Sequence, residues 1–167
     1  MHFRTVYITL LLAALAAGCD VMPTGVRGSR QMGILEWRIH PSLQVRAQAR
    51  LETASELARA VIAAPDTVEA GAFFTATVTT IGADYCWQPA DATLQLDGST
   101  AVVTPYDSVL SYPDTGCADA RRELLHPVRL RFTRPGEAVL RVRGRKVVGQ
   151  DLDGGEEVVV EKRIQVL

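Results

Sequence analysis

VRLRFTRPGEAVLRVRGR, residues 128–145, contains two runs in which apolar and polar residues alternate. The apolar positions of the two runs are Val128, Leu130, Phe132, Ala138, Leu140 and Val142. A period of two places such residues on one face of a β-strand and the arginines between them on the other. Pro135 and Gly136 separate the runs and are typical of the central positions of a type II turn. The stretch therefore predicts two β-strands joined by a tight turn.

Similar patterns recur upstream and downstream of this stretch. Phe73–Ile81 (FFTATVTTI) alternates apolar residues with threonines, and Asp97-Gly98 separates two further short strands, which is a hairpin signal. Residues 33–40 are expected to form a strand with Leu35, Trp37 and Ile39 on one face, whereas residues 105–122 are expected to form a long loop. Seven or so short alternating strands predict an all-β sandwich rather than a parallel α/β sheet.

Residues 42–64 fit two periodicities. Apolar residues at every second position of 43–51 favour a strand, whereas Leu51, Ala54, Leu57, Ala58 and Val61 suit a helical stripe. We expect N-terminal strands and a helical or irregular insert over 32–64, followed by the sandwich over 65–167.

Two segments carry a family resemblance. PDTVEAGAFFTATVTTIG (65–82) resembles the opening strands of bacterial immunoglobulin-like domains, and FTRPGEAVLRVRGR (132–145), together with the C-terminal VVVEKRIQVL, resembles their closing hairpin. The resemblance covers about residues 60–167 and implies an immunoglobulin-like β-sandwich with a role in adhesion, binding or scaffolding. Trp87 adjoins Cys86, which departs from the antibody pattern.

The N-terminus is expected to be an export signal. Residues 6–17 are uncharged and mostly apolar, too short to span a bilayer but suited to a signal peptide over 1–18. LAAGC (15–19) resembles the bacterial lipobox, which implies that Cys19 is lipidated and anchors the chain to a membrane of the cell envelope, facing the periplasm or the exterior. An ordinary cleaved secretory signal is the alternative. Residues 19–31 are expected to form a flexible tether.

Charge and motifs exclude several functions. The formal net charge is −1, so nothing in the overall charge favours nucleic acid. The sequence contains no phosphate-binding glycine loop and no nucleophile–base signature, so we expect a non-catalytic protein without a cofactor or a metal.

Cys86 and Cys117 are the two cysteines that remain after Cys19. In an oxidising compartment an even pair predicts a disulfide. A metal site with His126, which precedes Pro127 at a predicted strand end, is the alternative.

Two groups of residues are candidates for binding an envelope protein or glycan. The first is a solvated arginine face formed by Arg129, Arg131, Arg141, Arg143 and Arg145. These arginines could bind a polyanion, or Glu157 and Glu161 could pair with those of the second run.

The second group is the aromatic set around the cysteine-bounded loop, namely Tyr85, Trp87, Tyr106 and Tyr112. These side chains suit partner recognition, or a local core that anchors the loop. The acidic segment 151–157 is expected to be a polar hairpin turn rather than a calcium loop.

Overall fold

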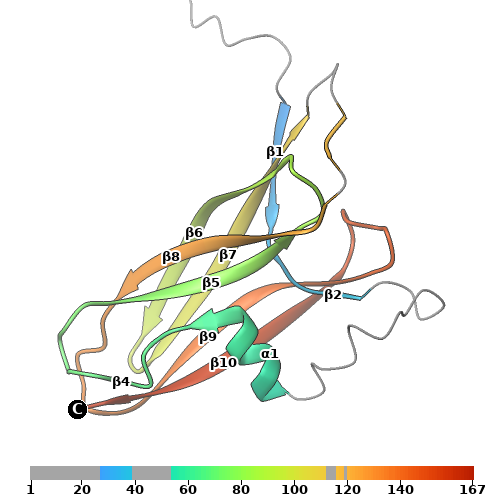
Figure 1. Ribbon diagram of the computed structural model, residues 1–167. Coiled ribbons are helices and arrows are strands. Elements are labelled where there is room, and N and C mark those ends of the chain that lie inside the picture. The colour runs from blue at the N-terminus through green and yellow to red at the C-terminus, as the bar shows by residue number, and fades with distance from the viewer. Residues whose placement is uncertain (1–26, 39–53, 112–115, 119) are drawn as a thin grey trace, which may run out of the picture.

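The computed structural model describes residues 27–38, 54–111, 116–118 and 120–167, which form two facing β-sheets and one short helix (Figure 1). The strands of the larger sheet are β1 (Arg27–Met32), β2 (Ile34–Arg38), β4 (Thr67–Val68), β6 (Trp87–Asp97), β7 (Thr100–Ser111), β9 (Gly136–Val148) and β10 (Glu156–Val166). Those of the smaller sheet are β3 (Ile62–Ala63), β5 (Phe74–Gly82) and β8 (Arg122–Leu130).

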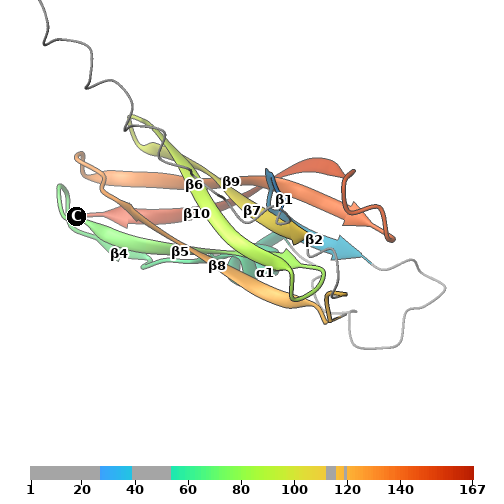
Figure 2. The same cartoon turned by 90° about the horizontal axis from the view of Figure 1, so that it is seen from above.

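The two sheets pack as layers of a sandwich. Strand order is β1-β7-β9-β10-β4 in the larger sheet, where β6 adds to β7 and β2 adds to β9, and β3-β5-β8 in the smaller one. Figure 2 shows β9 and β10 in one layer and β5 and β8 in the other. The predicted all-β, sandwich-like fold is confirmed.

The core lies between the sheets and is built from the residues that the alternation predicts. The six apolar positions of residues 128–145 are all 8 % exposed or less, and Ala76 and Val78 on β5 are fully buried. Phe74 and Phe132 contact each other at a centroid distance of 6.0 Å. Each large apolar side chain buried in this way contributes about 1.5–3 kcal/mol.

β1 and β2 lie between β7 and β9 where these two strands no longer pair with each other. β7 pairs with β9 only from Thr100 to Val103, and beyond that point β1 pairs with β7 while β2 pairs with β9. The N–H of Gly33, between the two strands, donates to the carbonyl of Pro105 at 2.9 Å, and its own carbonyl accepts from the N–H of Arg145 at 2.9 Å.

The predicted tether through Gln31 is therefore wrong in its last part, because Arg27–Gln31 belongs to β1. Strand pairing satisfies backbone groups of β7 that β9 no longer reaches, and this needs no apolar pattern in the added segment. β1 and β2 thus belong to the larger sheet, together with strands of the predicted sandwich region 65–167.

Two strands are longer than predicted. The expected loop over 105–122 is wrong at both ends, since β7 continues to Ser111 and β8 starts at Arg122. His126 accordingly lies within β8, not at a strand end. The alternation of apolar and polar residues does not extend over the full length of β7 and β8, because Asp107 and His126 occupy inward positions of these strands.

β2 is buried on both sides. Ile34 is 0 % and Leu35 is 3 % exposed, so the predicted single apolar face is wrong here. Leu35 packs into the main core, whereas Ile34 packs with Trp87 and other residues of a second cluster, so β2 lies between two apolar regions.

The helical alternative for the ambiguous stretch is confirmed over α1 (Ala54–Val61). Leu57, Ala58 and Val61 pack on the main core, and α1 contacts β3, β5 and β10. The strand expected over 43–51 lies outside the described residues. Among the helical residues that the structure describes, no segment has the length and apolarity needed to cross a membrane.

Candidate functional site

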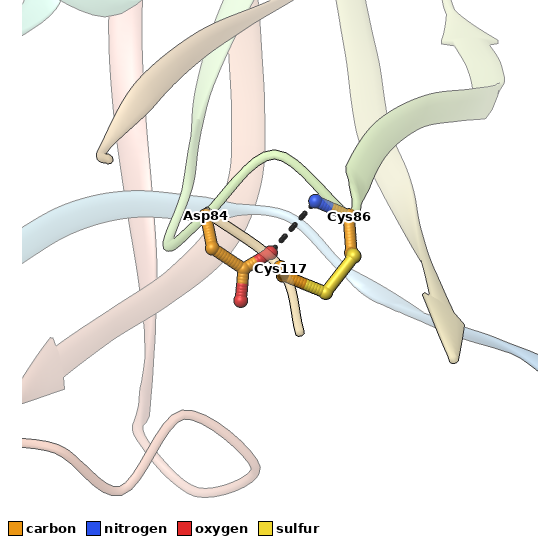
Figure 3. The surroundings of a disulfide bond; sticks show 3 residues. All are labelled: Asp84, Cys86 and Cys117. Atoms are coloured by element: carbon orange, nitrogen blue, oxygen red, sulfur yellow. Dashed lines mark hydrogen bonds between the residues drawn. A yellow bond between two sulfur atoms is a disulfide. The ribbon is translucent and has the colours of Figure 1, made fainter. Parts of the chain in front are cut away.

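Cys86 and Cys117 are joined by a disulfide whose Cα atoms lie 5.6 Å apart (Figure 3). The N–H of Cys86 donates to Oδ1 of Asp84 at 2.8 Å, and the N–H of Tyr85 donates to the carbonyl of Ala118 at 3.2 Å. The bridge thus fixes residues 117–118 against the connection between β5 and β6. Because both sulfurs are used in the bond, neither can serve as a thiolate ligand, and the metal alternative for this pair loses its basis.

Trp87 is part of a small core rather than a binding surface. Its side chain is 3 % exposed and packs with Ile34, Ala83, Leu124 and Val147 beneath the disulfide end of the sandwich. The binding role predicted for Trp87 is wrong, and the alternative of a local core is confirmed for this residue.

The tyrosines of the aromatic set have different surroundings. The guanidinium carbon of Arg30 lies 3.5 Å from the ring centroid of Tyr106, and the same guanidinium pairs with Asp91 at 2.8 Å. The hydrogen bond from Arg30 lowers the pKa of the Asp91 carboxyl. Tyr85 is 59 % exposed. Tyr112 lies outside the described residues.

The predicted arginine face is divided between the two sheets. Arg141 and Arg143 lie on β9 and donate to Glu161 at 2.7 Å and to Glu157 at 3.0 Å on β10. The alternative in which glutamates pair with these arginines is confirmed. Beside them is a hollow of about 370 Å³ on the outer face of the larger sheet, lined by Gln95, Val102, Arg141, Arg143, Val159 and Glu161.

Arg129 lies on β8 of the smaller sheet and Arg131 directly follows that strand, so the prediction of one continuous face is wrong. Their guanidinium carbons lie 4.2 Å and 4.9 Å from the ring centroid of Phe73, which is itself 53 % exposed. Neither arginine pairs with a carboxylate of the described residues. We call these three residues the Phe73 platform. Sequence reasoning missed Phe73, because it was assigned only to a strand.

Arg145 is buried, so it too departs from the predicted solvated face. Its side chain is 8 % exposed and donates to five oxygens, which belong to Met32, Gln31, Leu152, Asp153 and Gly154. Burial lowers the pKa of Arg145.

The predicted hairpin turn over 151–157 is confirmed for residues 151–155, which lie between β9 and β10, whereas Glu156 and Glu157 belong to β10. Asp151 accepts from the N–H of Gly154 at 3.1 Å, and backbone carbonyls of this segment face the Arg145 guanidinium. The cation that the loop surrounds is thus a side chain of the same chain.

A buried polar cluster joins the two sheets. Thr80 Oγ1 donates to Asp107 Oδ1 at 2.9 Å, and His126 Nε2 lies 3.0 Å from both of these oxygens. All three side chains are 2 % exposed or less, and among the described residues neither Asp107 Oδ2 nor His126 Nδ1 has a hydrogen-bond partner. Thr80 follows Ala76 and Val78 at the same two-residue spacing, so alternation along the strand places it on the inward face. This spacing could have identified Thr80 from the sequence.

Comparison with known proteins adds no relative. No protein-family model matches the chain, and no match is found among the curated proteins or the solved structures.

Proposed function

We propose that the chain is a non-catalytic lipoprotein of the bacterial cell envelope, anchored through Cys19, whose sandwich serves as a structural or binding module. The observation that carries this proposal is the Cys86–Cys117 disulfide. Disulfides persist in exported proteins and are rare in the cytosol. The leader 1–18 and the lipobox-like LAAGC, which lie outside the described residues, supply the route and the anchor.

The chemistry of the described residues supports a non-catalytic role. Asp107 and His126 are the titratable side chains that come together in the interior, and at 0 % and 2 % exposure they are closed to a substrate. General acid–base catalysis needs a group within hydrogen-bond reach of the reacting atom. The exposed carboxylates Glu157 and Glu161 are occupied by arginines instead.

The anchor would orient the sandwich relative to the membrane. Cys19 precedes Arg27, the first residue of β1, by eight residues, which span at most roughly 28 Å when extended. Arg27 pairs with Ser111, and the neighbouring Leu110 donates its N–H to the carbonyl of Cys86. The disulfide end is therefore the membrane-proximal end, and Figure 1 shows the C-terminus at the opposite end.

Intact-mass measurement of the full chain expressed in a bacterium tests the proposal. We expect a mass that lacks residues 1–18, carries a diacylglyceryl group on Cys19, and rises by two hydrogens on reduction. Cys19→Ser is expected to lose the lipid and to leave the detergent phase on partitioning.

Cys117→Ser is the matched control, because it removes a different thiol. It is expected to keep the lipid and to lose only the response to reduction. Recovery of the wild-type chain from the cytosol with its leader attached and three free thiols would overturn the proposal.

A further inference from the structure

The geometry points to the Phe73 platform as a binding site for an anionic polysaccharide, a proposal that gives the binding module of the proposed function its ligand class. The platform consists of Phe73, which precedes β5, and of Arg129 and Arg131, at the end of β8. It lies on the smaller sheet, away from the hollow that Arg141 and Arg143 line.

The two arginines of the platform share one aromatic ring, and neither pairs with a carboxylate of the described residues. Arg30, Arg141, Arg143 and Arg163 each pair with a carboxylate. Both guanidinium groups of the platform, those of Arg129 and Arg131, lie beside the Phe73 ring instead. Two like charges held near one ring repel each other, and an anion between them would relieve that repulsion.

The ring positions the guanidinium groups for recognition. A cation over an aromatic face gains about 0.5–1 kcal/mol at exposed sites, and this contact limits the freedom of a long side chain. A guanidinium that is already oriented presents parallel N–H donors to two oxygens of a carboxylate, sulfate or phosphate group. Phe73 therefore serves as a positioning residue for the two arginines.

The surface next to the platform suits a sugar chain. The outward residues of β5 include Thr75 and Thr77, which pair across the ladder with Arg129 and Pro127. Leu125, the next outward residue of β8, is 55 % exposed. Hydroxyl groups beside exposed apolar side chains can contact the hydroxyls and the C–H groups of sugar rings, and the two paired strands provide an extended surface.

The Phe73 platform lies at the end of the sandwich that is distant from the proposed membrane anchor. Phe132, next to Arg131, accepts the N–H of Gly71, and the adjacent Ala70 donates its N–H to the carbonyl of the C-terminal Leu167. Figure 1 shows the C-terminus at the end of the sandwich opposite to β1. A ligand on the platform is thus a polymer beyond the membrane surface rather than a headgroup of the membrane that holds Cys19.

Titration of the full chain in detergent with polygalacturonate tests the inference, with neutral dextran and poly-L-glutamate of matched length as comparison probes. We expect binding to polygalacturonate that weakens with salt. We also expect binding to poly-L-glutamate that is at least tenfold weaker at equal charge, and none to dextran. R129Q combined with R131Q is expected to weaken binding of polygalacturonate by about tenfold, since two charge-assisted contacts are lost.

The matched control is R141Q combined with R143Q, which removes the same charge from exposed strand positions of the other sheet. Less than a threefold loss is expected there, and F73L is expected to weaken binding while the net charge stays constant. Circular dichroism spectra check that each variant is folded.

Several results would overturn the inference. They are equal losses in the two arginine pairs, equal binding of the polypeptide and polysaccharide probes, or no binding of polygalacturonate by the wild-type chain. None of these results bears on lipidation of Cys19, so failure here and failure of the proposed anchor are distinguishable.

Discussion

Thr80, Asp107 and His126 place a charged or polar group where a sandwich normally has hydrocarbon. They come from β5, β7 and β8, so their hydrogen bonds connect the smaller sheet to the larger one. A buried carboxyl group is costly unless it is hydrogen-bonded. Here Oδ1 of Asp107 makes the hydrogen bonds, while Oδ2 has none with the described residues. The cluster therefore specifies the position of one sheet relative to the other. An apolar cluster of the same size would contribute as much or more to the free energy of unfolding.

Asp107→Ala is expected to lower the free energy of unfolding by about 3–5 kcal/mol, because it leaves Thr80 and His126 buried without the Asp107 oxygen that both contact. Urea denaturation followed by circular dichroism measures the change. The combined T80V, D107L and H126L variant, which removes every polar group of the cluster, is expected to recover most of the loss. A loss below 1 kcal/mol in Asp107→Ala would show that the cluster does not couple the sheets.

The main chain at Gly33 packs directly against Thr80 and Asp107 of this cluster. A Cβ atom at position 33 would lie 3.1 Å from Asp107 Oδ2 and would overlap Thr80 Cγ2. Gly33→Ala is expected to cost about 1–3 kcal/mol by overpacking, as measured by thermal or urea unfolding.

Gly116→Ala is the control for this substitution, since a Cβ atom there meets no atom of the described residues within 4 Å. If the two variants were equally stable, the close approach at Gly33 would have no energetic consequence.

At the scale of elements, the sequence predicts strands well where inward positions are apolar and poorly where they are not. Residues 128–145 and β5 could be assigned from alternation, because Val, Leu and Phe mark the inward face. The second half of β7 could not, because its inward position is Asp107. Neither could β1, because its residues 27–32 show no apolar alternation. Hydrophobic periodicity reports burial of side chains, not hydrogen bonding of the main chain.

The candidate site shows the same limit. The arginines and the cysteine pair were identified from residue type and spacing, and Arg141 and Arg143 did find the predicted glutamates. Which sheet carries Arg129 and Arg131 depends on where β8 pairs, and the strand pattern alone does not contain that information. The contact of both with Phe73 follows from that pairing.

Arg145 on β9 contacts β1 and the loop between β9 and β10, and it is expected to stabilise the conformation of that loop. It contacts the end of β1 and the carbonyls of Leu152, Asp153 and Gly154, so Arg145→Gln leaves several oxygens of the loop without a donor. We expect a loss of about 2–4 kcal/mol in the free energy of unfolding and faster amide hydrogen exchange over residues 149–155.

Arg143→Gln is the matched control for Arg145→Gln. It lies two residues away on the same strand, but its ion pair with Glu157 is half exposed. Its loss is expected to cost less than about 1 kcal/mol. Unchanged exchange in the loop of Arg145→Gln would contradict the role that we assign to the buried guanidinium.

At the scale of the whole molecule, the proposed anchor would be attached at one end of the sandwich, and the Phe73 platform lies toward the other end. β7 runs the length of the larger sheet, from Thr100 beside β9 to Ser111 opposite Arg27. Its twelve residues span roughly 40 Å at about 3.3 Å per residue. A protein tethered through residues 19–26 would thus hold its arginine platform well above the membrane, where an anionic polymer is within reach.

Energy transfer in vesicles tests this arrangement. With Cys19 acylated as proposed and the other two cysteines joined by the disulfide, a single introduced cysteine would be the only free thiol of the anchored chain. Ser29→Cys and Ser99→Cys are matched variants, since both serines are exposed and lie at opposite ends of the sandwich. With a donor on the thiol and acceptors on lipid headgroups, we expect efficient transfer from position 29 and weak transfer from position 99. Equal transfer from both would mean that the sandwich lies flat on the bilayer, and the platform would then be available to headgroups as well as to polymers.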